Sequence, residues 1–444
     1  MCSTKSYLFH FGFTTFVPAP NTPQMKLVYN LAIEAYSLAI KIVSPFNARA
    51  RDWVAGRKNI LQSVRASVRK GERRVWFHAA SLGEFEQGRP VMESFRQANP
   101  DVKIVLTFFS PSGYNVRKNY QGADYVYYLP ADTPKNAAAF VSAIAPEAAI
   151  FIKYEFWYNY LRVLSERQIP SVLISGIFRP QHHFFRWYGR FFRRMLRYFD
   201  HLFVQDVASA SLLRGIGIEN VTVSGDTRFD RVVAIVAKAE PVEVVSRFSN
   251  EERVLVAGSS WPGDEEIIAR YRRENPGRFR YIIAPHEVDR RNTDRIAGLF
   301  GAGSVRFTEY GRSSDRASDV LVLDTIGILS SVYRYSYICC IGGGFGKGIH
   351  NILEAAAWGK PVLFGPNYQK FREANDLIAL GGAKSFDSYE QFEAVVNKWS
   401  DDEVSCNEAS VACSAYVSDN KGSTELIVAY LLNQQPNEPA NREG

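Results

Sequence analysis

Residues 74–85 read Arg-Val-Trp-Phe-His-Ala-Ala-Ser-Leu-Gly-Glu-Phe, and this stretch decides the fold class. Its first part, 75–79, is a short apolar run typical of a strand that is buried on both faces. A turn of small residues follows, and the pattern becomes helical over about 85–98. A strand, a small-residue turn and a helix in this order predict the start of a βαβ unit.

The same alternation continues along the chain. Further strands are predicted at 102–107, 125–129, 148–152, 171–175 and 201–205, and after Glu240 at 253–258, 281–284, 320–324, 338–341 and 361–364. Short apolar strands separated by helices indicate parallel sheets covered on both faces. We therefore expect an α/β protein with two doubly wound, Rossmann-like domains that face a central cleft, where the carboxyl ends of the strands bind ligands.

The length of 444 residues suits two domains of about 200 residues each. We interpret 1–24 as a mis-annotated or disordered extension before a start at Met25, and 431–444 as a disordered tail. The predicted divisions between them are an anchor helix at 25–50, a first Rossmann-like domain at 51–235 and a second at 236–430.

The net charge of +7 indicates an anionic partner, which is phosphate, nucleic acid or a membrane surface. The five cysteines have neither zinc spacing nor a disulfide framework. The sequence also lacks the Asp-x-Asp pair by which a divalent metal commonly holds a sugar diphosphate. We expect no metal and no cofactor.

Two segments suggest contact with a membrane. Between Leu27 and Phe46 only Glu34 and Lys41 are charged, over about 20 residues, which is near the minimum for a membrane span. This segment is either an interfacial or single-pass anchor, or an amphipathic helix packed on its own domain. Residues 178–199 hold six arginines among aromatic residues and no acid, which suits an anionic lipid surface better than nucleic acid or a solvated helix face. The candidate surface residues are Arg186, Arg190, Arg193, Arg194 and Arg197.

A glycine-rich stretch at 341–351, Ile-Gly-Gly-Gly-Phe-Gly-Lys-Gly-Ile-His-Asn, lies between a predicted strand and a predicted helix. Glycines such as Gly343 and Gly344 allow backbone N–H groups to approach an anion at a helix N-terminus. The stretch is neither a Walker A loop nor a dinucleotide fingerprint, and a merely tight turn is the alternative. Asn351 and Glu354 are three residues apart and can share a helix face, where the carboxylate suits ribose hydroxyls.

Several further polar residues follow predicted strands. Glu84 is a candidate general base or, alternatively, a first-turn acid that complements the helix dipole. Glu155 follows the 148–152 strand, and Pro285 with His286 follows the 281–284 strand. Arg228 either neutralises a leaving phosphate or pairs with a nearby acid.

Taken together, these motifs resemble the lipid A Kdo transferases, GT-B glycosyltransferases that attach 3-deoxy-D-manno-octulosonic acid (Kdo) to a lipid A precursor. The similarity runs from Met25 to about residue 430. It rests on motifs in a fixed order: the Met25 helix, His-x-x-Ser-x-Gly-Glu at 78–84, 154–158, 225–230, 257–266, Pro285-His286, and 342–366 with His350-Asn351-x-x-Glu354.

The resemblance implies an inverting transfer without metal, from CMP-Kdo to a lipid A precursor at the cytoplasmic face of the inner membrane. The first domain would bind the acceptor, with Glu84 as the base and Glu155 and Arg228 stabilising the transition state. The second would hold CMP through Pro285, His286, Ile326, Gly327, Ile328, Gly343, Gly344, Asn351, Ile352, Leu353 and Glu354. The implied partners are the donor, the acceptor and an anionic membrane surface, and no nucleic acid is expected.

Two alternatives stay open. A GT-B transferase or epimerase using a UDP-sugar would share the glycine-rich loop and the ribose-binding Glu. A non-catalytic membrane-bound scaffold would use the arginine and aromatic surface and would need no base. A nicotinamide oxidoreductase is disfavoured because the glycine motif lies late in the chain.

Overall fold

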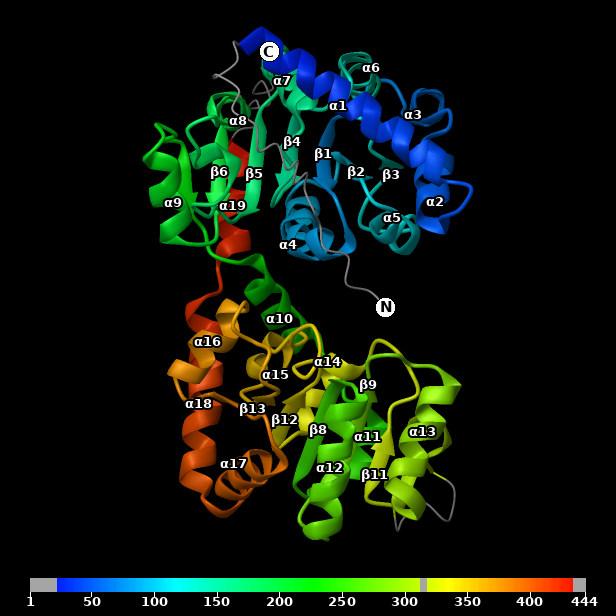
Figure 1. Ribbon diagram of the computed structural model, residues 1–444, viewed down its shortest axis with the longest axis vertical. Helices are drawn as coiled ribbons and strands as arrows, with labels where there is room; N and C mark the ends of the chain where they lie inside the picture. The colour runs from blue at the N-terminus through cyan, green and yellow to red at the C-terminus, as the bar shows by residue number, and fades with distance from the viewer. Residues whose placement is uncertain (1–21, 312–317, 434–444) are drawn as a thin grey trace, which may run out of the picture. The chain divides into compact units, whose positions relative to one another are not determined.

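A computed structural model describes residues 22–311 and 318–433 (Figure 1). The chain forms two compact units, one comprising Met1–Arg228 with Gly422–Gly444 and the other Phe229–Lys421. The first unit thus ends seven residues before the predicted boundary at 235, and the end of the chain returns to it. The interpretations of 1–24 and 431–444 concern mostly residues 1–21 and 434–444, which lie outside the described residues.

The first unit contains seven parallel strands in the order β3-β2-β1-β4-β5-β6-β7. The strands are β1 Arg74–Ala79, β2 Lys103–Phe108, β3 Tyr125–Tyr128, β4 Ala148–Ile152, β5 Ser171–Gly176, β6 His201–Val204 and β7 Val221–Val223. Its helices are α1 Thr22–Val43, α2 Ala48–Arg57, α3 Ile60–Ser67, α4 Leu82–Ala98, α5 Pro111–Arg117, α6 Pro134–Ile144, α7 Tyr158–Glu166, α8 Arg190–Leu196, α9 Val207–Arg214 and α19 Ser423–Asn433.

The second unit contains another seven parallel strands in the order β10-β11-β9-β8-β12-β13-β14. They are β8 Val254–Ser260, β9 Arg280–Pro285, β10 Ser304–Arg306, β11 Val320–Val322, β12 Ile338–Ile341, β13 Val362–Phe364 and β14 Ala383–Ser385. The helices are α11 Glu243–Ser249, α12 Pro262–Glu274, α13 Arg290–Phe300, α14 Leu329–Val332, α15 Leu353–Ala357, α16 Arg372–Ala379, α17 Tyr389–Asp401 and α18 Glu403–Asp419. Helix α10, Thr227–Lys238, passes from the first unit into the second.

The prediction of two doubly wound α/β halves is confirmed, since both sheets are parallel and helices separate most of their strands in the chain. Three strands were not predicted from the sequence: β7, β10 and β14. Each has three residues and lies at the edge of its sheet, where a short strand buries too little to produce a clear apolar run.

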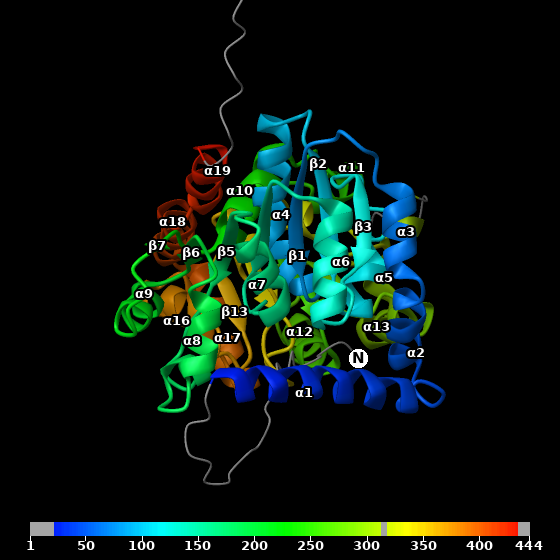
Figure 2. The ribbon, with the colours of Figure 1, turned by 90° about the horizontal axis from the view of Figure 1, so that it is seen from above.

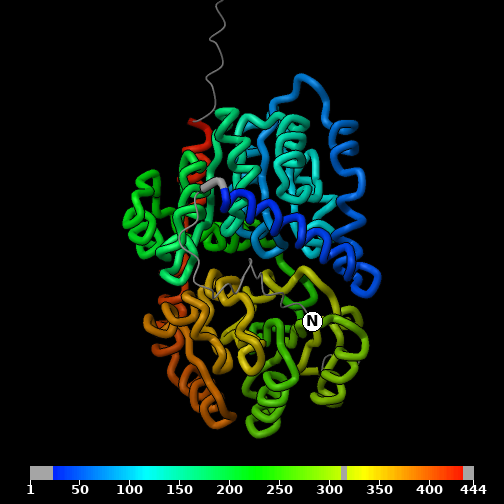
Figure 3. Tube along the Cα trace, turned by 45° about the horizontal axis from the view of Figure 1, so that its top comes forward, coloured from blue at the N-terminus to red at the C-terminus, as the bar shows by residue number. Residues whose placement is uncertain are grey.

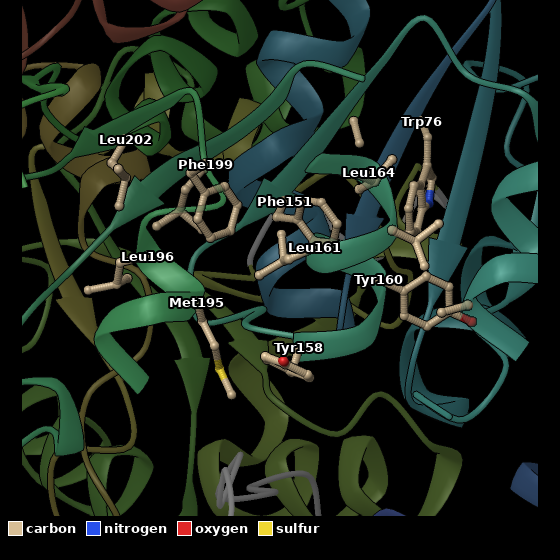
Figure 4. Close-up of a cluster of buried hydrophobic side chains, with 14 of the residues drawn as sticks. Trp76, Phe151, Tyr158, Tyr160, Leu161, Leu164, Met195, Leu196, Phe199 and Leu202 are labelled. Carbon is tan, nitrogen blue, oxygen red and sulfur yellow. The ribbon is translucent and has the colours of Figure 1, made fainter. Parts of the chain in front are cut away.

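Both faces of the first sheet are buried, which explains why its strands lack polar–apolar alternation. Trp76 and Phe151 project to one face and pack with Tyr160 and Leu161 of α7 (Figure 4). On the other face, Phe77 belongs to a cluster with Phe85 of α4 and with three side chains of α19. The last described helix therefore completes the core of the first unit. Its side chains there are Ile427, Val428 and Leu431.

Helix α1 lies along the outside of the first unit, with one end near α7 and α8 and the other near α2 (Figures 2 and 3). Tyr29 packs its ring against Tyr158 and Phe191 at centroid distances of 5.6 and 5.8 Å. Its hydroxyl donates a hydrogen bond of 2.6 Å to the buried Asp132. Within the described parts of the chain, no helix combines the length and apolarity that crossing a bilayer requires.

Asp132 also caps α7, because its two carboxylate oxygens accept hydrogen bonds from the backbone N–H groups of Asn159 and Tyr160 at 3.1 and 3.0 Å. Asn159 in turn donates through Nδ2 to Asn30 of α1 at 2.9 Å. The side of α1 that carries Tyr29 and Asn30 is thus held by specific polar contacts, and a single carboxylate joins this helix to α7.

We predict that Tyr29→Phe loosens α1. The substitution removes one donor from a buried carboxylate, so the free energy of opening this helix should fall by about 1–2 kcal/mol. Hydrogen–deuterium exchange over residues 24–43 should then be roughly tenfold faster. Tyr125→Phe, which removes a hydrogen bond to Glu72 nearer the surface, should leave exchange in α1 unchanged. Equal effects of both variants would contradict the prediction.

Candidate active site

Glu84 lies in the first turn of α4, directly beyond the carboxyl end of β1. The helix begins at Leu82, three residues before the predicted start, because Ser81 adopts an extended conformation at the N-cap. Glu84 is 5% exposed, and its Oε2 accepts a hydrogen bond of 2.9 Å from Ser81 Oγ. Burial is the main cause that raises the pKa of Glu84 to about 7; the carboxyl of Glu155 adds to it when that group is ionised, and Ser81 and Lys153 oppose it. A carboxyl with this pKa is suited to accept a proton near neutral pH.

Glu155 is connected to the end of β1 by a buried hydrogen-bond network. Its Oε2 lies 2.8 Å from Nε2 of His78 and accepts a bond of 2.7 Å from the indole Nε1 of Trp157. The other ring nitrogen of His78, Nδ1, lies 2.8 Å from Thr107 Oγ1 on β2. His78 is fully buried and Glu155 is 3% exposed, so the network fixes both side chains.

The geometry assigns the protons in this network. The indole of Trp157 can only donate, and its single N–H is shared between Glu155 Oε2 at 2.7 Å and Nε2 of His78 at 3.1 Å, which favours an Nε2 without a proton. The imidazole proton is then on Nδ1, facing Thr107, and Glu155 supplies the proton for its own bond to His78. Burial acts in the same direction, since it lowers the pKa of His78 and raises that of Glu155. Glu155 is therefore held as a neutral acid beside Glu84.

Lys153 follows β4 and has a left-handed backbone, with φ at 68°. Non-glycine residues adopt this conformation at a cost, and such strain is concentrated at functional sites. Its positive charge lowers the pKa of Glu84. The sequence reasoning assigned no role to Lys153, His78 or Trp157, although all three stand next to predicted strand ends.

Arg228 lies at the start of α10. Its Nε donates to Asp226 at 2.8 Å, so the arginine pairs with a nearby acid, as the alternative interpretation expected. The preceding residue, Thr227, donates through its hydroxyl to the carbonyl of Gln87 on α4, one turn beyond Glu84. The first unit therefore brings Glu84 and Glu155 together. It also places the start of α10 against α4, the helix that carries Glu84. The hydrogen bond and ion pair described for Arg228 go to Asp226.

In the second unit, three aromatic rings stack beyond the ends of adjacent strands. His286, directly after β9, lies 4.9 Å from Trp261 and 4.3 Å from His350 between ring centroids. Trp261 donates through Nε1 to Nε2 of His350 at 2.9 Å, which fixes His350 as an acceptor. The stack forms a flat face of the kind on which a nucleobase can pack. Trp261 and His350 were parts of recognised motifs but were not among the predicted site residues.

The glycine-rich turn follows β12 and is tightly packed. Gly343 has φ at 93°, and its N–H donates to the buried carboxylate of Asp264 at 3.1 Å. A Cβ at Gly344 would lie 2.6 Å from the backbone of Gly365, so only glycine fits there. The loop is therefore held in one shape, and part of its hydrogen-bonding capacity is used by Asp264.

The expectation that Asn351 and Glu354 share a helix face needs correction. Helix α15 begins only at Leu353, so Asn351 lies before it and accepts a hydrogen bond from the backbone N–H of Leu353. The two side chains still meet, because Asn351 Nδ2 donates to Glu354 Oε1 at 3.0 Å. Glu354 also accepts from Ser330 Oγ. The helix has five residues, which weakens the expected dipole contribution.

The remaining predicted donor residues differ in accessibility. Ile352 and Leu353 are fully buried, so they can contribute only backbone groups. Ile326 is 82% exposed, Gly327 has φ at 95°, and Ile328 precedes α14. Pro285 ends β9 and places His286. Within 22–311 and 318–433, no group of three His, Cys, Asp or Glu side chains is arranged to hold a metal ion.

The arginine segment is divided between core and surface. Phe184, Phe191 and Phe199 are buried, so part of the aromatic pattern reflects core packing. Trp187 is 71% exposed, and Arg186, Arg190, Arg194 and Arg197 are exposed beside it. Arg193 is half-buried and donates to the carbonyl of Phe184. No ion pair links these five arginines to an acid among the described residues.

Comparisons with known proteins agree with the resemblance. Residues 55–231, which hold Glu84, Glu155 and Arg228, match a family model described as 3-deoxy-D-manno-octulosonic-acid transferase (kdotransferase). The 3-deoxy-D-manno-octulosonic acid transferase of Aquifex aeolicus is 25% identical over 316 residues, covering 70% of this chain and 80% of that protein. That of Haemophilus influenzae is 25% identical over 315 residues, covering 67% and 72%. The chain is a relative of the Kdo transferases.

Solved structures support the fold. The UDP-GlcNAc 2-epimerase of Neisseria meningitidis has a TM-score of 0.57 at 16% identity, covering 81% of this chain and all of that one. The MurG structure from Acinetobacter baumannii has a TM-score of 0.52 at 11% identity, covering 81% and 99%. The predicted GT-B fold is confirmed, and so is the enzyme class, a glycosyltransferase.

We predict that the pKa of Glu84 depends on its hydrogen bond with Ser81 and not on a charge at Glu155. Ser81→Ala should shift this pKa upward, because it removes a hydrogen bond to the ionised form. Glu155→Gln replaces one neutral group by another and should leave the pKa of Glu84 at about 7. Titration of 13C-labelled Glu carboxyls by NMR measures both. A Glu84 pKa that falls in Glu155→Gln would contradict the neutral state of Glu155.

Proposed function

We propose that this protein transfers Kdo from CMP-Kdo to a lipid A precursor, with inversion at the anomeric carbon. The observation that carries the proposal is the buried Glu84, with a pKa raised to about 7, in a unit that matches the Kdo transferase family model. The Kdo transferases among its relatives support the sugar and the acceptor class. The CMP donor and the role of Glu84 are our inferences.

In this mechanism Glu84 removes the proton from the acceptor hydroxyl. The hydroxyl oxygen forms a bond to the anomeric carbon of Kdo as the bond from that carbon to the phosphate of CMP breaks, and the electron pair leaves with CMP. Burial of Glu84 strengthens it as a base, because the ionised carboxylate is poorly solvated.

Glu155 and Arg228 have separate roles in the proposal. Glu155, fixed by His78 and Trp157, donates a hydrogen bond to oxygen that gains negative charge in the transition state. Arg228 supplies positive charge for the phosphate that leaves, and Asp226 orients its guanidinium. Both act on charge that develops during the reaction rather than on the bound substrates alone.

The second unit would hold the donor. The proposed contacts of CMP are the ring stack with His286 for the base, the Gly343 and Gly344 turn for the phosphate, and Glu354 for the ribose. Asn351 orients Glu354 through their hydrogen bond. Pro285, Ile326, Gly327, Ile328, Ile352 and Leu353 shape this site through the backbone.

We also propose that the protein works as a peripheral protein on an anionic membrane, where its lipid acceptor resides. The solvent-facing side of α1 carries an apolar stripe at helical spacing, whose members Leu27, Leu31, Leu38 and Ile42 are 55–64% exposed. Phe46, just beyond the helix, is 91% exposed. Large exposed apolar side chains in such a row mark an interaction surface. The arginines of 186–197 would contact lipid phosphates at the end where Tyr29 packs on Phe191.

The first experiment is Kdo transfer from CMP-Kdo, generated in situ, to a lipid A precursor, with EDTA present. Glu84→Gln should lower kcat by roughly 10²- to 10⁴-fold, because a general base is lost. Wild-type activity should rise with pH through about 7, as Glu84 ionises, and Glu93→Gln on the solvent side of the same helix should retain this profile. No transfer under conditions in which a known Kdo transferase is active would reject the donor and acceptor. Inhibition by UDP rather than CMP would instead favour a UDP-sugar.

The second experiment measures binding to anionic vesicles. The double substitution Leu31→Glu and Leu38→Glu should weaken binding at least about tenfold, because it removes apolar contact and adds charge that the lipid headgroups repel. Val411→Glu, at a residue of α18 that is 58% exposed, is the control and should bind like wild type. Unchanged binding of the double variant would exclude α1 as the membrane surface.

A further inference from the structure

The first unit contains an apolar groove that the proposed reaction leaves unused. It has a volume of about 380 Å³ and lies between α1, α2 and the turn after β2. Most of its lining is apolar, including Ala39, Val43, Ala50, Trp53, Phe109 and Pro111. The volume is within the range of about 300–1,000 Å³ that is typical of sites for small organic ligands.

The floor of the groove is rigid. Tyr36, Trp53 and Phe109 pack ring against ring, at centroid distances of 6.1–6.3 Å. The guanidinium of Arg57 stacks on Trp53 at 3.9 Å and donates to the carbonyl of Phe109 at 2.7 Å. The floor is therefore preformed, and binding would cost little ordering of the protein.

One end of the groove opens at the proposed membrane surface. Ala39 and Val43 line it and also belong to the solvent-facing side of α1, next to Leu38 and Ile42. Arg49 is exposed on the rim and forms no ion pair with any acid in the described part of the chain. An apolar ligand could thus enter from a bilayer, and an anionic group attached to it would meet a positive charge.

The other end leads toward the reacting groups. The ring of Phe109 lies 4.7 Å from that of Trp157, the residue that donates to Glu155. The next residue, Ser110, donates through its backbone N–H to the carbonyl of Ala80 at 2.8 Å, in the turn that leads to Glu84. The groove therefore connects the lipid-facing side of α1 with the turn that carries the proposed base.

We propose that this groove binds one acyl chain of the glycolipid acceptor and that Arg49 contacts a phosphate on its sugar. An acyl chain is apolar and unbranched, so it suits the apolar lining. It also links a bilayer to a sugar headgroup, which matches a groove with one end at the proposed membrane surface and the other end near the proposed base. The inference rests on the proposed function, since it assigns part of the acceptor to a site beside the same base.

The test compares two exposed alanines of the first unit. Ala39→Trp fills the groove, while Ala66→Trp adds the same ring to α3, outside the lining and away from α1. With an acylated lipid A precursor, Ala39→Trp should raise KM about tenfold, and Ala66→Trp should behave like wild type. With a chemically deacylated disaccharide bisphosphate, both variants should equal wild type. Ala50→Leu, from α2, fills the groove with a smaller side chain and should change KM in the same direction.

A binding measurement separates this inference from the proposed function. A lipid A precursor with a diazirine in one acyl chain is photocrosslinked to full-length protein in anionic vesicles, without any CMP-Kdo. Crosslinks should map to Trp53, Phe109 and Pro111 in wild type and be at least about tenfold weaker in Ala39→Trp. Crosslinks confined to Leu31 and Leu38, or equal crosslinking in both alanine variants, would overturn the groove assignment. Absence of Kdo transfer with intact groove crosslinks would reject the reaction alone.

Discussion

The hydrogen bond between His78 and Glu155 is the interaction on which the candidate site of the first unit depends. It joins the ends of β1 and β4, which are neighbours in the sheet, and neither side chain has access to water that could replace it. Removing either partner would leave the other one hydrogen bond short in a buried site, which costs about 1–3 kcal/mol. The pair is satisfied with both groups neutral, so the site avoids burying an isolated charge. This leaves Glu84 as the nearby carboxyl suited to gain and lose a proton near neutral pH.

Parallel sheets impose the same arrangement on both units. Their strands are apolar on both faces, so polar side chains can gather only where strands end. In the first unit these ends supply His78, Lys153 and the turn before Glu84. In the second they supply Trp261, His286 and the glycine turn, whose Gly343 is held by Asp264. The two sets differ in chemistry: one is built around carboxyl groups, and the other around rings and backbone N–H groups.

The sequence predicted what depends on local pattern and missed what depends on contacts between distant residues. All eleven predicted strands exist, and ten of them are central strands, which are buried on both faces and must therefore be apolar throughout. The edge strand β14, Ala383–Ser385, carries no such signal, since it has only one neighbour. The return of α19 to the first unit could not be seen either, because an amphipathic helix does not encode which core it covers. Glu84 and Glu155 were found from their positions after strands, but Trp157 and Trp261 were not, since an aromatic residue at a strand end is usually structural.

One carboxylate, that of Asp132, links the position of α1 to the network around Glu155. Asp132 accepts a hydrogen bond from Tyr29 of α1 and caps α7, whose N-cap residue is Trp157. Trp157 donates to Glu155 and packs on Phe109, which in turn packs on Trp53 of α2. Helices α1 and α2 are therefore both linked to Trp157, α1 through Asp132 and α2 through Phe109. A surface that positions a lipid would, by these contacts, also hold Trp157, and through it Glu155, in one orientation. The apolar exterior and the buried acid pair are thus parts of one packed structure.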